Sequence, residues 1–184
     1  MQIYDNFFQE SQLIKIHEYL EKPTWKWHKS NKTDKTTFKN FEVTHIDYFR
    51  EYLLEYINLK LCRPIMQSPY RLERVYFNGH DYKEDGTFHQ DTDSEGKITA
   101  IKLSTGAIQM SHAFGGEGFT FITYMNKEYK DTWGGATEFQ DPHELIVPEY
   151  NKSILFKGIR LHRGLAFTKH KVPRRITMVF KLYK

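Results

Sequence analysis

The chain has 184 residues, a net charge of +4 and 16% aromatic residues, which is typical of one globular domain, 1–184, rich in β-strands. Its single cysteine, Cys62, excludes an internal disulfide framework, and its scattered lysines favour acidic partners only weakly. Because no apolar run is long enough to span a membrane and the first residues do not resemble a signal peptide, we expect a cytoplasmic protein without a membrane partner.

Helical periodicity is confined to the first third of the chain. Apolar residues at three- and four-residue spacing predict a helix over 9–22, with Ser11 as its N-cap. A second, stronger stripe predicts a helix over 45–61, and the polar segment between the two indicates a loop or an irregular strand. We therefore expect residues 1–62 to be a helical support. The stripe residues are Leu13, Ile16 and Leu20 in the first helix and Ile46, Phe49, Leu53, Ile57 and Leu61 in the second.

After Pro64 the apolar period changes from helical spacing to two, and Gly, Asn and Asp separate short runs. Two helices followed by such strands predict an α+β, mainly β fold. The expected core is a double-stranded β-helix (jelly roll) over 70–184, with the two N-terminal helices packed on one sheet. The predicted strands are 70–77, 98–103, 107–111, 119–125, 136–139, 144–147, 153–157 and 175–183.

The last predicted strand, 175–183, has two different faces because side chains alternate along a strand. One face is apolar, whereas the other begins with Arg175. A charged side chain on a partly apolar inner face needs a partner or a ligand. The apolar face holds Ile176, Met178, Phe180 and Leu182, and the other face holds Arg175, Thr177 and Val179.

A candidate metal site begins at His89 and Asp91. Residues two apart on a strand point the same way, so both side chains can bind one ion. His162 follows the predicted strand 153–157 and supplies a second histidine. Two histidines and one carboxylate form the facial triad of non-haem Fe(II) sites, which leaves three adjacent coordination positions open. The alternative for the H-x-D pair alone is a solvated pair of side chains.

Arg175 is a candidate anchor for a carboxylate, because a guanidinium donates two parallel hydrogen bonds. Thr177 faces the same side and can donate a third. A dicarboxylate such as 2-oxoglutarate can then bind iron at one end and Arg175 at the other. Arg174 is the rival anchor; it faces the opposite side of a regular strand, so the alternation favours Arg175, and a β-bulge would reverse this choice.

Four segments of residues 70–184 together resemble a known family. They read RVYFNGHDYKEDGTFHQDTD, FTFITYMNKEYKDTWGGATEF, VPEYNKSILFKGIRLHRG and RRITMVFKL. In this order they resemble the prolyl 4-hydroxylase branch of the 2-oxoglutarate/Fe(II) dioxygenase superfamily. The opening segment, IYDNFFQESQLIKI, is similar to the start of the first helix in that family. Each motif is loose alone, but their order together with the metal ligands and the arginine is specific.

The resemblance implies roles for five residues of the chain. His89, Asp91 and His162 match the iron ligands that carry catalysis. Arg175 matches the 2-oxoglutarate anchor. Tyr124 matches a tyrosine that donates its hydroxyl to the same distal carboxylate, and its alternative is a core aromatic residue.

Two aromatic residues and one insertion are linked to the substrate side of the site. Tyr76 is a candidate substrate- or cosubstrate-pocket residue, and Trp133 is a candidate rim aromatic that can equally serve packing. The chain departs from the family over 92–118, where we expect an inserted β-hairpin and a glycine-rich turn beside the metal site. His112 in this insertion is expected to be an exposed or capping histidine and not a fourth ligand.

The resemblance also implies a reaction and its cofactors. Fe(II), 2-oxoglutarate and O2 hydroxylate a C–H bond while 2-oxoglutarate becomes succinate and CO2, with ascorbate as an optional reductant. The substrate it favours is a prolyl residue in a peptide or protein. One alternative is a nucleobase or nucleic-acid oxygenase, for which the lysine-rich segment 22–39 supplies phosphate contacts. Another is a jelly-roll binding module without turnover, which does not explain the intact ligand set and Arg175.

Overall fold

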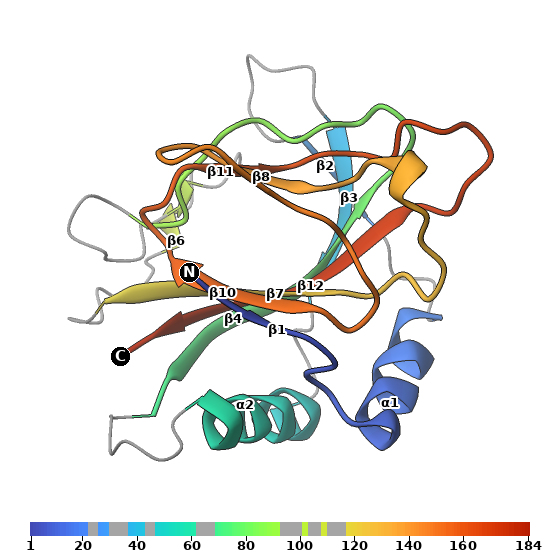
Figure 1. The fold of residues 1–184 in the computed structure, drawn as a ribbon. Coiled ribbons are helices and arrows are strands. Elements are labelled where there is room, and N and C mark those ends of the chain that lie inside the picture. The colour runs from blue at the N-terminus through green and yellow to red at the C-terminus, as the bar shows by residue number, and fades with distance from the viewer. Residues whose placement is uncertain are drawn as a thin grey trace.

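The computed structural model shows two helices on one side of a large antiparallel sheet, with further short strands on its other side (Figure 1). Cys62, Ile46 and His112 lie outside the residues that the structure describes. No described helix is both long enough and apolar enough to cross a membrane. The structure describes residues 1–21, 26–29, 37–42, 47–61, 69–92, 101–102, 108–109 and 117–184, of which 26–29, 37–42, 47–48, 101–102 and 108–109 are described by their backbone alone.

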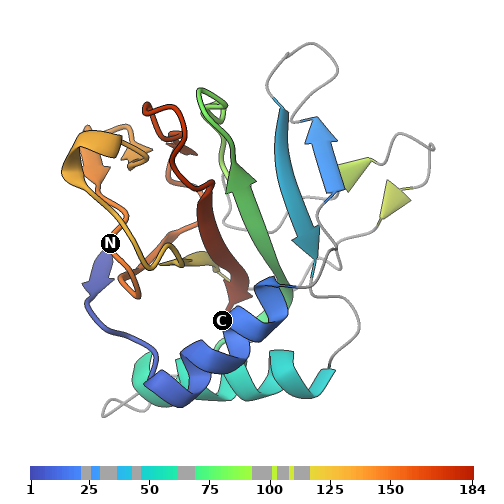
Figure 2. The same cartoon turned by 90° about the vertical axis from the view of Figure 1, so that its right-hand side faces the viewer.

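The two predicted helices are confirmed as α1 (Glu10–Leu20) and α2 (Asp47–Leu61). Both lie against the same face of the large sheet, side by side beneath it (Figure 2). The predicted apolar stripes explain this packing, because the stripe residues face the sheet. Leu13, Ile16, Phe49, Leu53 and Ile57 are buried, and Leu20 and Leu61 are partly buried against them.

The prediction for the N-cap of α1 was wrong. Gln9 is the N-cap and Ser11 is the second residue of the helix, exposed to solvent. The Gln12 side chain accepts a hydrogen bond from the backbone N–H of Gln9 at 2.8 Å. Gln12 is almost fully buried, so this bond fixes the first turn from inside the protein.

The large sheet has seven strands in the order β1-β10-β7-β12-β4-β3-β2. All of its neighbouring pairs are antiparallel, with β12 at the centre between β7 and β4. The strands are β1 (Gln2–Tyr4), β2 (Lys26–Lys29), β3 (Thr37–Glu42), β4 (Arg71–His80), β7 (Gly118–Tyr124), β10 (Ser153–Lys157) and β12 (Arg175–Tyr183).

A second sheet has three antiparallel strands in the order β11-β8-β9, and it lies across from the large sheet (Figure 1). A separate pair, β5 with β6, falls within the segment 92–118, most of which lies outside the described residues. A short 3-10 helix, η1 (Asp131–Trp133), precedes β8. The bounds are β5 (Ile101–Lys102), β6 (Ile108–Gln109), β8 (Thr137–Phe139), β9 (Glu144–Ile146) and β11 (His162–Gly164).

The large sheet separates two clusters of buried side chains. The outer cluster joins both helices to one face of the sheet, and its sheet residues include Phe77, Phe121 and Phe180. The inner cluster lies between the two sheets. Its members are Tyr76, Ile122, Tyr124, Phe139, Ile146, Ile154, Phe156 and Val179.

The predicted alternation on the last strand is confirmed by this division. Met178, Phe180 and Leu182 join the outer cluster, whereas Val179 joins the inner one. The inner face of β12 therefore begins at Arg175 and runs through Thr177 and Val179 to Lys181. The register places Thr177 opposite Tyr124, Val179 opposite Ile122 and Tyr76, and Lys181 opposite Thr120 and Arg74.

Candidate metal centre

His89 and His162 are brought together by a short antiparallel bridge. The backbone N–H of each residue donates to the carbonyl of the other, both at 3.0 Å, and the ring centroids are 4.5 Å apart. The H-x-D segment is therefore not the regular strand that the sequence predicted. A single bridge, followed by the bond from Asp91 N–H to the Gly158 carbonyl at 2.8 Å, fixes it beside β11.

The three predicted metal ligands form one cluster. One ligand atom from each of His89, Asp91 and His162 lies within 4.8 Å of the others. The Nε2 atom of His89 is 3.5 Å from Oδ1 of Asp91, and Nε2 of His162 is 3.5 Å from Oδ2. The structure thus places all three donors around one point, as a facial triad requires.

Backbone carbonyls orient both imidazole rings. Nδ1 of His89 lies 2.9 Å from the Thr87 carbonyl, and Nδ1 of His162 lies 2.8 Å from the Arg160 carbonyl. A carbonyl can only accept, so Nδ1 carries the hydrogen and the lone pair of each ring is on Nε2. Metal-binding histidines are commonly held by such contacts on the distal ring nitrogen.

The protonation states of the triad suit a divalent cation. Burial lowers the pKa of His162 to about 4, so this imidazole is neutral at neutral pH. Burial alone would raise the pKa of the Asp91 carboxyl, but the Lys181 ammonium holds that pKa well below its usual range. Neutral imidazole nitrogen and ionised carboxylate oxygen are the donors that Fe(II) sites of this kind use.

Lys181, which was not predicted as a site residue, contacts the Asp91 carboxylate directly through its ammonium nitrogen. The hydroxyl of Thr120 donates to the same oxygen, Oδ2. Lys181 has the same strand parity as Arg175, so the alternation already placed it on the inner face. The contact between Lys181 and Asp91 could not be predicted from the sequence, because the two residues meet only when the H-x-D segment folds over β12.

Arg175 lies on the same inner face, with only 2% of its surface exposed. Its Nε donates to the Gly135 carbonyl at 2.6 Å and its Nη2 donates to the Thr137 hydroxyl at 2.9 Å. Burial lowers its pKa, yet an arginine stays protonated at neutral pH. Among the described residues no carboxylate pairs with this cation, so its charge faces neutral oxygens only.

Tyr124 and Thr177 stand beside Arg175, as the resemblance implied for a shared pocket. The Tyr124 hydroxyl donates to the Thr137 hydroxyl oxygen at 2.7 Å, and its ring centroid lies 5.5 Å from the guanidinium carbon. Thr177 is buried directly opposite Tyr124 in the sheet register. Arg175, Tyr124 and Thr177 therefore line one polar end of the inner face.

Gly164 links this polar end to the metal ligands. It lies two residues after His162 on β11, so the two positions are about 7 Å apart and face the same way. A Cβ added to Gly164 would lie 3.2 Å from Nη1 of Arg175 and 3.2 Å from Nε2 of His80. The guanidinium thus lies close to the triad, at a spacing that a five-carbon dicarboxylate can bridge.

Arg174, the rival anchor, points elsewhere. Its Nε and Nη2 atoms donate to the two carboxylate oxygens of Asp81 at 2.5 and 3.3 Å, and the pair is partly exposed. This position agrees with the alternation that favoured Arg175.

The two predicted substrate residues lie in different places. Tyr76 is buried on the inner face, with the Lys181 ammonium 5.8 Å and the Arg74 guanidinium 4.4 Å from its ring centroid. It is therefore beside the metal ligands. Trp133 packs edge-on against Phe167 at 5.6 Å, just before the two glycines that lead to β8. Its assignment as a rim aromatic stays a prediction.

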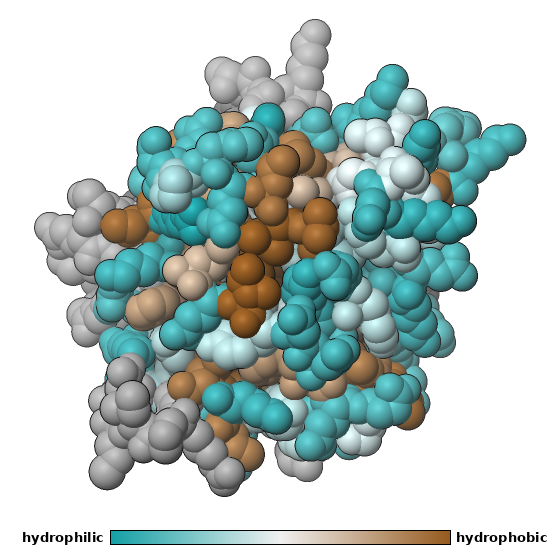
Figure 3. Space-filling model, viewed as in Figure 1, coloured by the Kyte–Doolittle hydropathy of each residue, from teal (hydrophilic) through white to brown (hydrophobic). Residues whose placement is uncertain are grey.

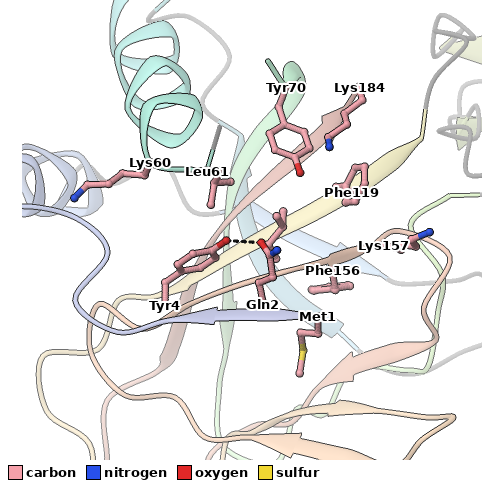
Figure 4. Close-up of a pocket in the computed structure, with 11 residues that line it drawn as sticks. Met1, Gln2, Tyr4, Lys60, Leu61, Tyr70, Phe119, Phe156, Lys157 and Lys184 are labelled. Carbon is pink, nitrogen blue, oxygen red and sulfur yellow. Dashed lines mark hydrogen bonds between the residues drawn. The ribbon is translucent and has the colours of Figure 1, made fainter. Parts of the chain in front are cut away.

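The surface has two other features. A cavity of about 490 Å³ opens beside β1 and the end of α2, and none of the predicted site residues lines it (Figure 4). Apolar side chains also gather near the centre of the face seen in Figure 3, with hydrophilic side chains around them. The exposed large apolar residues of the chain include Met1, Ile3, Leu145, Val147 and Ile159.

Comparison with known proteins gives structural relatives only. No family model matches the sequence, and no curated protein matches it. An oxidoreductase of the 2OG-Fe(II) oxygenase family from Burkholderia pseudomallei has a TM-score of 0.66 at 10% identity, over 97% of this chain and 82% of its own. A Pseudomonas putida prolyl-4-hydroxylase has a TM-score of 0.66 at 10% identity, over 100% and 92%.

A third relative is a prolyl hydroxylase from Trichoplax adhaerens, solved in complex with a peptide fragment of the hypoxia inducible factor oxygen degradation domain. Its TM-score is 0.63 at 12% identity, over 99% of this chain and 82% of its own. At such identities the likeness shows the fold. The chain has the fold of the 2-oxoglutarate/Fe(II) oxygenase structures, prolyl hydroxylases included, as the sequence resemblance predicted.

Proposed function

We propose that the chain is an Fe(II)- and 2-oxoglutarate-dependent oxygenase that hydroxylates a C–H bond. One observation carries the proposal: the His-Asp-His cluster stands beside a buried arginine that has no carboxylate partner among the described residues. A divalent cation bound by the His-Asp-His cluster would satisfy the three ligands. A dicarboxylate between this cation and Arg175 would supply the missing partner of the arginine. A binding module without turnover has no need of this pair of features.

We further propose that the two facing sheets form a double-stranded β-helix within one domain, 1–184. The seven-stranded and three-stranded sheets enclose the inner cluster, and α1 and α2 support the outer face of the large sheet. In this proposal 70–184 is the core, and 1–62 supplies the two helices together with β1, β2 and β3 at the edges of the large sheet. The segment 92–118, which directly follows Asp91, is an insertion that shapes substrate choice.

His89, Asp91 and His162 would hold the iron. Each presents one donor atom, so the other coordination positions stay open for 2-oxoglutarate and O2. When bound, Fe(II) with these two molecules supplies the conversion of 2-oxoglutarate to succinate and CO2 and the hydroxylation of the substrate. Ascorbate would serve as an optional reductant.

Arg175 would bind the distal carboxylate of 2-oxoglutarate through the N–H groups that Gly135 and Thr137 leave available. Tyr124 and Thr177 add hydroxyl groups at the same end. The apolar residues between this end and the triad exclude water from the middle of the cosubstrate. The position of Gly164 supports this assignment, since a larger side chain would stand against the guanidinium.

The proposed substrate is a prolyl residue in a peptide or protein. Two of the structural relatives are prolyl hydroxylases, and one of them was solved with a peptide bound. His89, whose side chain is about half exposed, marks the open side of the triad, where such a chain could lie. Tyr76 would line this side, and Trp133 would stand at the rim.

The test is iron-dependent conversion of 2-oxoglutarate to succinate, followed with and without peptide. His162→Ala and Asp91→Ala should each lower turnover by more than about a hundredfold, because loss of a ligand costs more than loss of a residue that orients one. His143→Ala is the matched control: this histidine is exposed and pairs with Glu138 outside the cluster. Full turnover in the ligand variants would disprove the metal assignment. A +16 Da product on a proline-containing peptide, and none on an oligonucleotide, would establish the substrate class.

A further inference from the structure

We propose that Lys181 is a positioning residue that makes Asp91 bind the metal through one oxygen. Together with Thr120 it occupies Oδ2 of Asp91 and leaves Oδ1 for the ion. This inference rests on the proposed function, because it concerns the same triad. It gives a role to a residue that lies in the segment RRITMVFKL but was not among the predicted site residues.

The contacts around the carboxylate are asymmetric. Oδ2 receives the ammonium of Lys181 and the hydroxyl of Thr120, whose own atoms are 3.4 Å apart. Each oxygen also has one imidazole nitrogen at 3.5 Å, Nε2 of His89 beside Oδ1 and Nε2 of His162 beside Oδ2, so among the described residues the difference lies in the ammonium and hydroxyl donors at Oδ2. An oxygen that already accepts from two donors, one of them charged, is a poor second ligand for a cation. The geometry therefore favours coordination through Oδ1 alone.

The lysine is fixed in place by the two strands that flank β12. Thr120 on β7 and Arg74 on β4 are its direct register partners. Its ammonium lies 5.8 Å from the Tyr76 ring centroid, and the side chain is only 12% exposed. A buried ammonium is costly unless it is paired, so its contact with Asp91 is a stable part of the fold.

The consequence concerns the open coordination positions. A facial triad leaves three positions, two for the 2-oxo acid and one for O2. A carboxylate that bound through both oxygens would take one of them. Lys181 prevents this, and its positive charge also weakens the attraction of the site for a divalent cation. We therefore expect Lys181 to lower metal affinity while preserving the binding of 2-oxoglutarate.

The experiment uses Co2+ as a spectroscopic probe with the full chain. Lys181→Met removes both the charge and the donor, so it should bind Co2+ at least about tenfold more tightly than the wild type. Its Co2+ absorption bands should shift as the coordination changes, and 2-oxoglutarate should bind the Co2+-loaded variant at least about tenfold more weakly. Lys157→Met is the matched control, because Lys157 is exposed and pairs with Glu117.

Lys181→Gln separates the two effects. Glutamine has no charge but can still donate to Oδ2, so Co2+ affinity should rise while the absorption bands stay as in the wild type. This variant also tests the proposal if Lys181→Met fails to fold. Unchanged or weaker Co2+ binding in a folded Lys181 variant would overturn it. None of these measurements needs turnover, so a wild type that binds Co2+ without converting 2-oxoglutarate would refute the proposed function alone.

Discussion

The inner face of β12 carries a cation at each end, Arg175 buried and Lys181 with 12% of its side chain exposed, and the two have different surroundings. Lys181 contacts the carboxylate of Asp91, and this contact raises the pKa of the lysine against the effect of burial. Arg175 donates to the Gly135 carbonyl and the Thr137 hydroxyl, and burial lowers its pKa. Within the part of the chain that the structure describes, Lys181 has a carboxylate partner and Arg175 has none.

Because of this difference, we assign a structural role to the charge of Lys181 and the binding of an anionic ligand to the charge of Arg175. Burying an ion without a counter-charge costs roughly several kcal/mol, so Arg175 without a bound anion lowers the stability of the folded protein. Lys181 is already compensated and can act on the metal through Asp91. The inner face therefore predicts an anion at the Arg175 end and a cation at the Asp91 end, in agreement with a dicarboxylate that bridges them.

Replacing the uncompensated cation should give the largest effect. We expect Arg175→Ala to weaken 2-oxoglutarate binding by roughly 2–5 kcal/mol, which is about thirtyfold or more, because it removes a buried charged partner. Titration of 2-oxoglutarate into the Co2+-loaded protein measures this directly.

Arg174→Ala is the control for this change. Its partly exposed pair with Asp81 contributes about 0–1 kcal/mol to stability and does not contact the partners of Arg175, so 2-oxoglutarate binding should change by less than about fivefold. Equal losses in the two variants would contradict the contrast between the paired and the unpaired cation. A larger loss in Arg174→Ala would move the anchor by one residue.

A smaller change at Gly164 tests whether the space beside Arg175 matters. Gly164→Ala would place a methyl group 3.2 Å from the guanidinium and 3.2 Å from the His80 ring. Crowding of this kind costs roughly 1–3 kcal/mol, so 2-oxoglutarate should bind about fivefold to a hundredfold more weakly while Co2+ binding stays unchanged. In Gly86→Ala the nearest atoms are the Gly164 backbone and the His80 ring, which makes it a suitable control. Equal effects of the two variants would show that general crowding, and not the guanidinium, is responsible.

Periodicity was sufficient to predict the fold class and the face that carries Arg175. Both helices and the alternation of β12 follow from spacing alone, because each extends over several repeats. β1 and β11 were not predicted, whereas β8 and β9, which also have three residues each, lie within predicted strands. Ser11 was chosen as the N-cap on residue type, whereas the structure uses a buried Gln12 side chain that only tertiary packing explains.

The candidate site was predictable in its ligands but not in its electrostatics. His89, Asp91 and His162 follow from motif and order, and the structure places them together. The contact between Lys181 and Asp91 depends on the path of the H-x-D segment, which leaves the strand pattern after β4. That no carboxylate of the described residues pairs with Arg175 likewise appears only once its neighbours are known. Sequence therefore predicts which side chains share a face, and the fold decides which charges are neutralised.

The smallest expected effect concerns His80, which lies beside Arg175. Burial, together with the smaller effect of the Arg175 charge, lowers the pKa of His80 to about 4, although the Glu84 carbonyl and Asp81 oppose the shift. The unfolded chain takes up a proton at this histidine below about pH 6.5, whereas the folded protein does so only near pH 4. The free energy of unfolding should therefore fall as the pH falls through this window.

Between pH 7 and pH 5.5 the loss from His80 should be about 1 kcal/mol, measured by urea unfolding of the metal-free protein. His80→Phe removes the titrating group, so the variant should lose about that much less stability over the same range, whatever its stability at pH 7. Added 2-oxoglutarate should also reduce the loss in the wild type, because a bound carboxylate offsets the charge of Arg175 that keeps His80 neutral. The same pH dependence in the two proteins would mean that His80 is not the group that responds to the unpaired arginine.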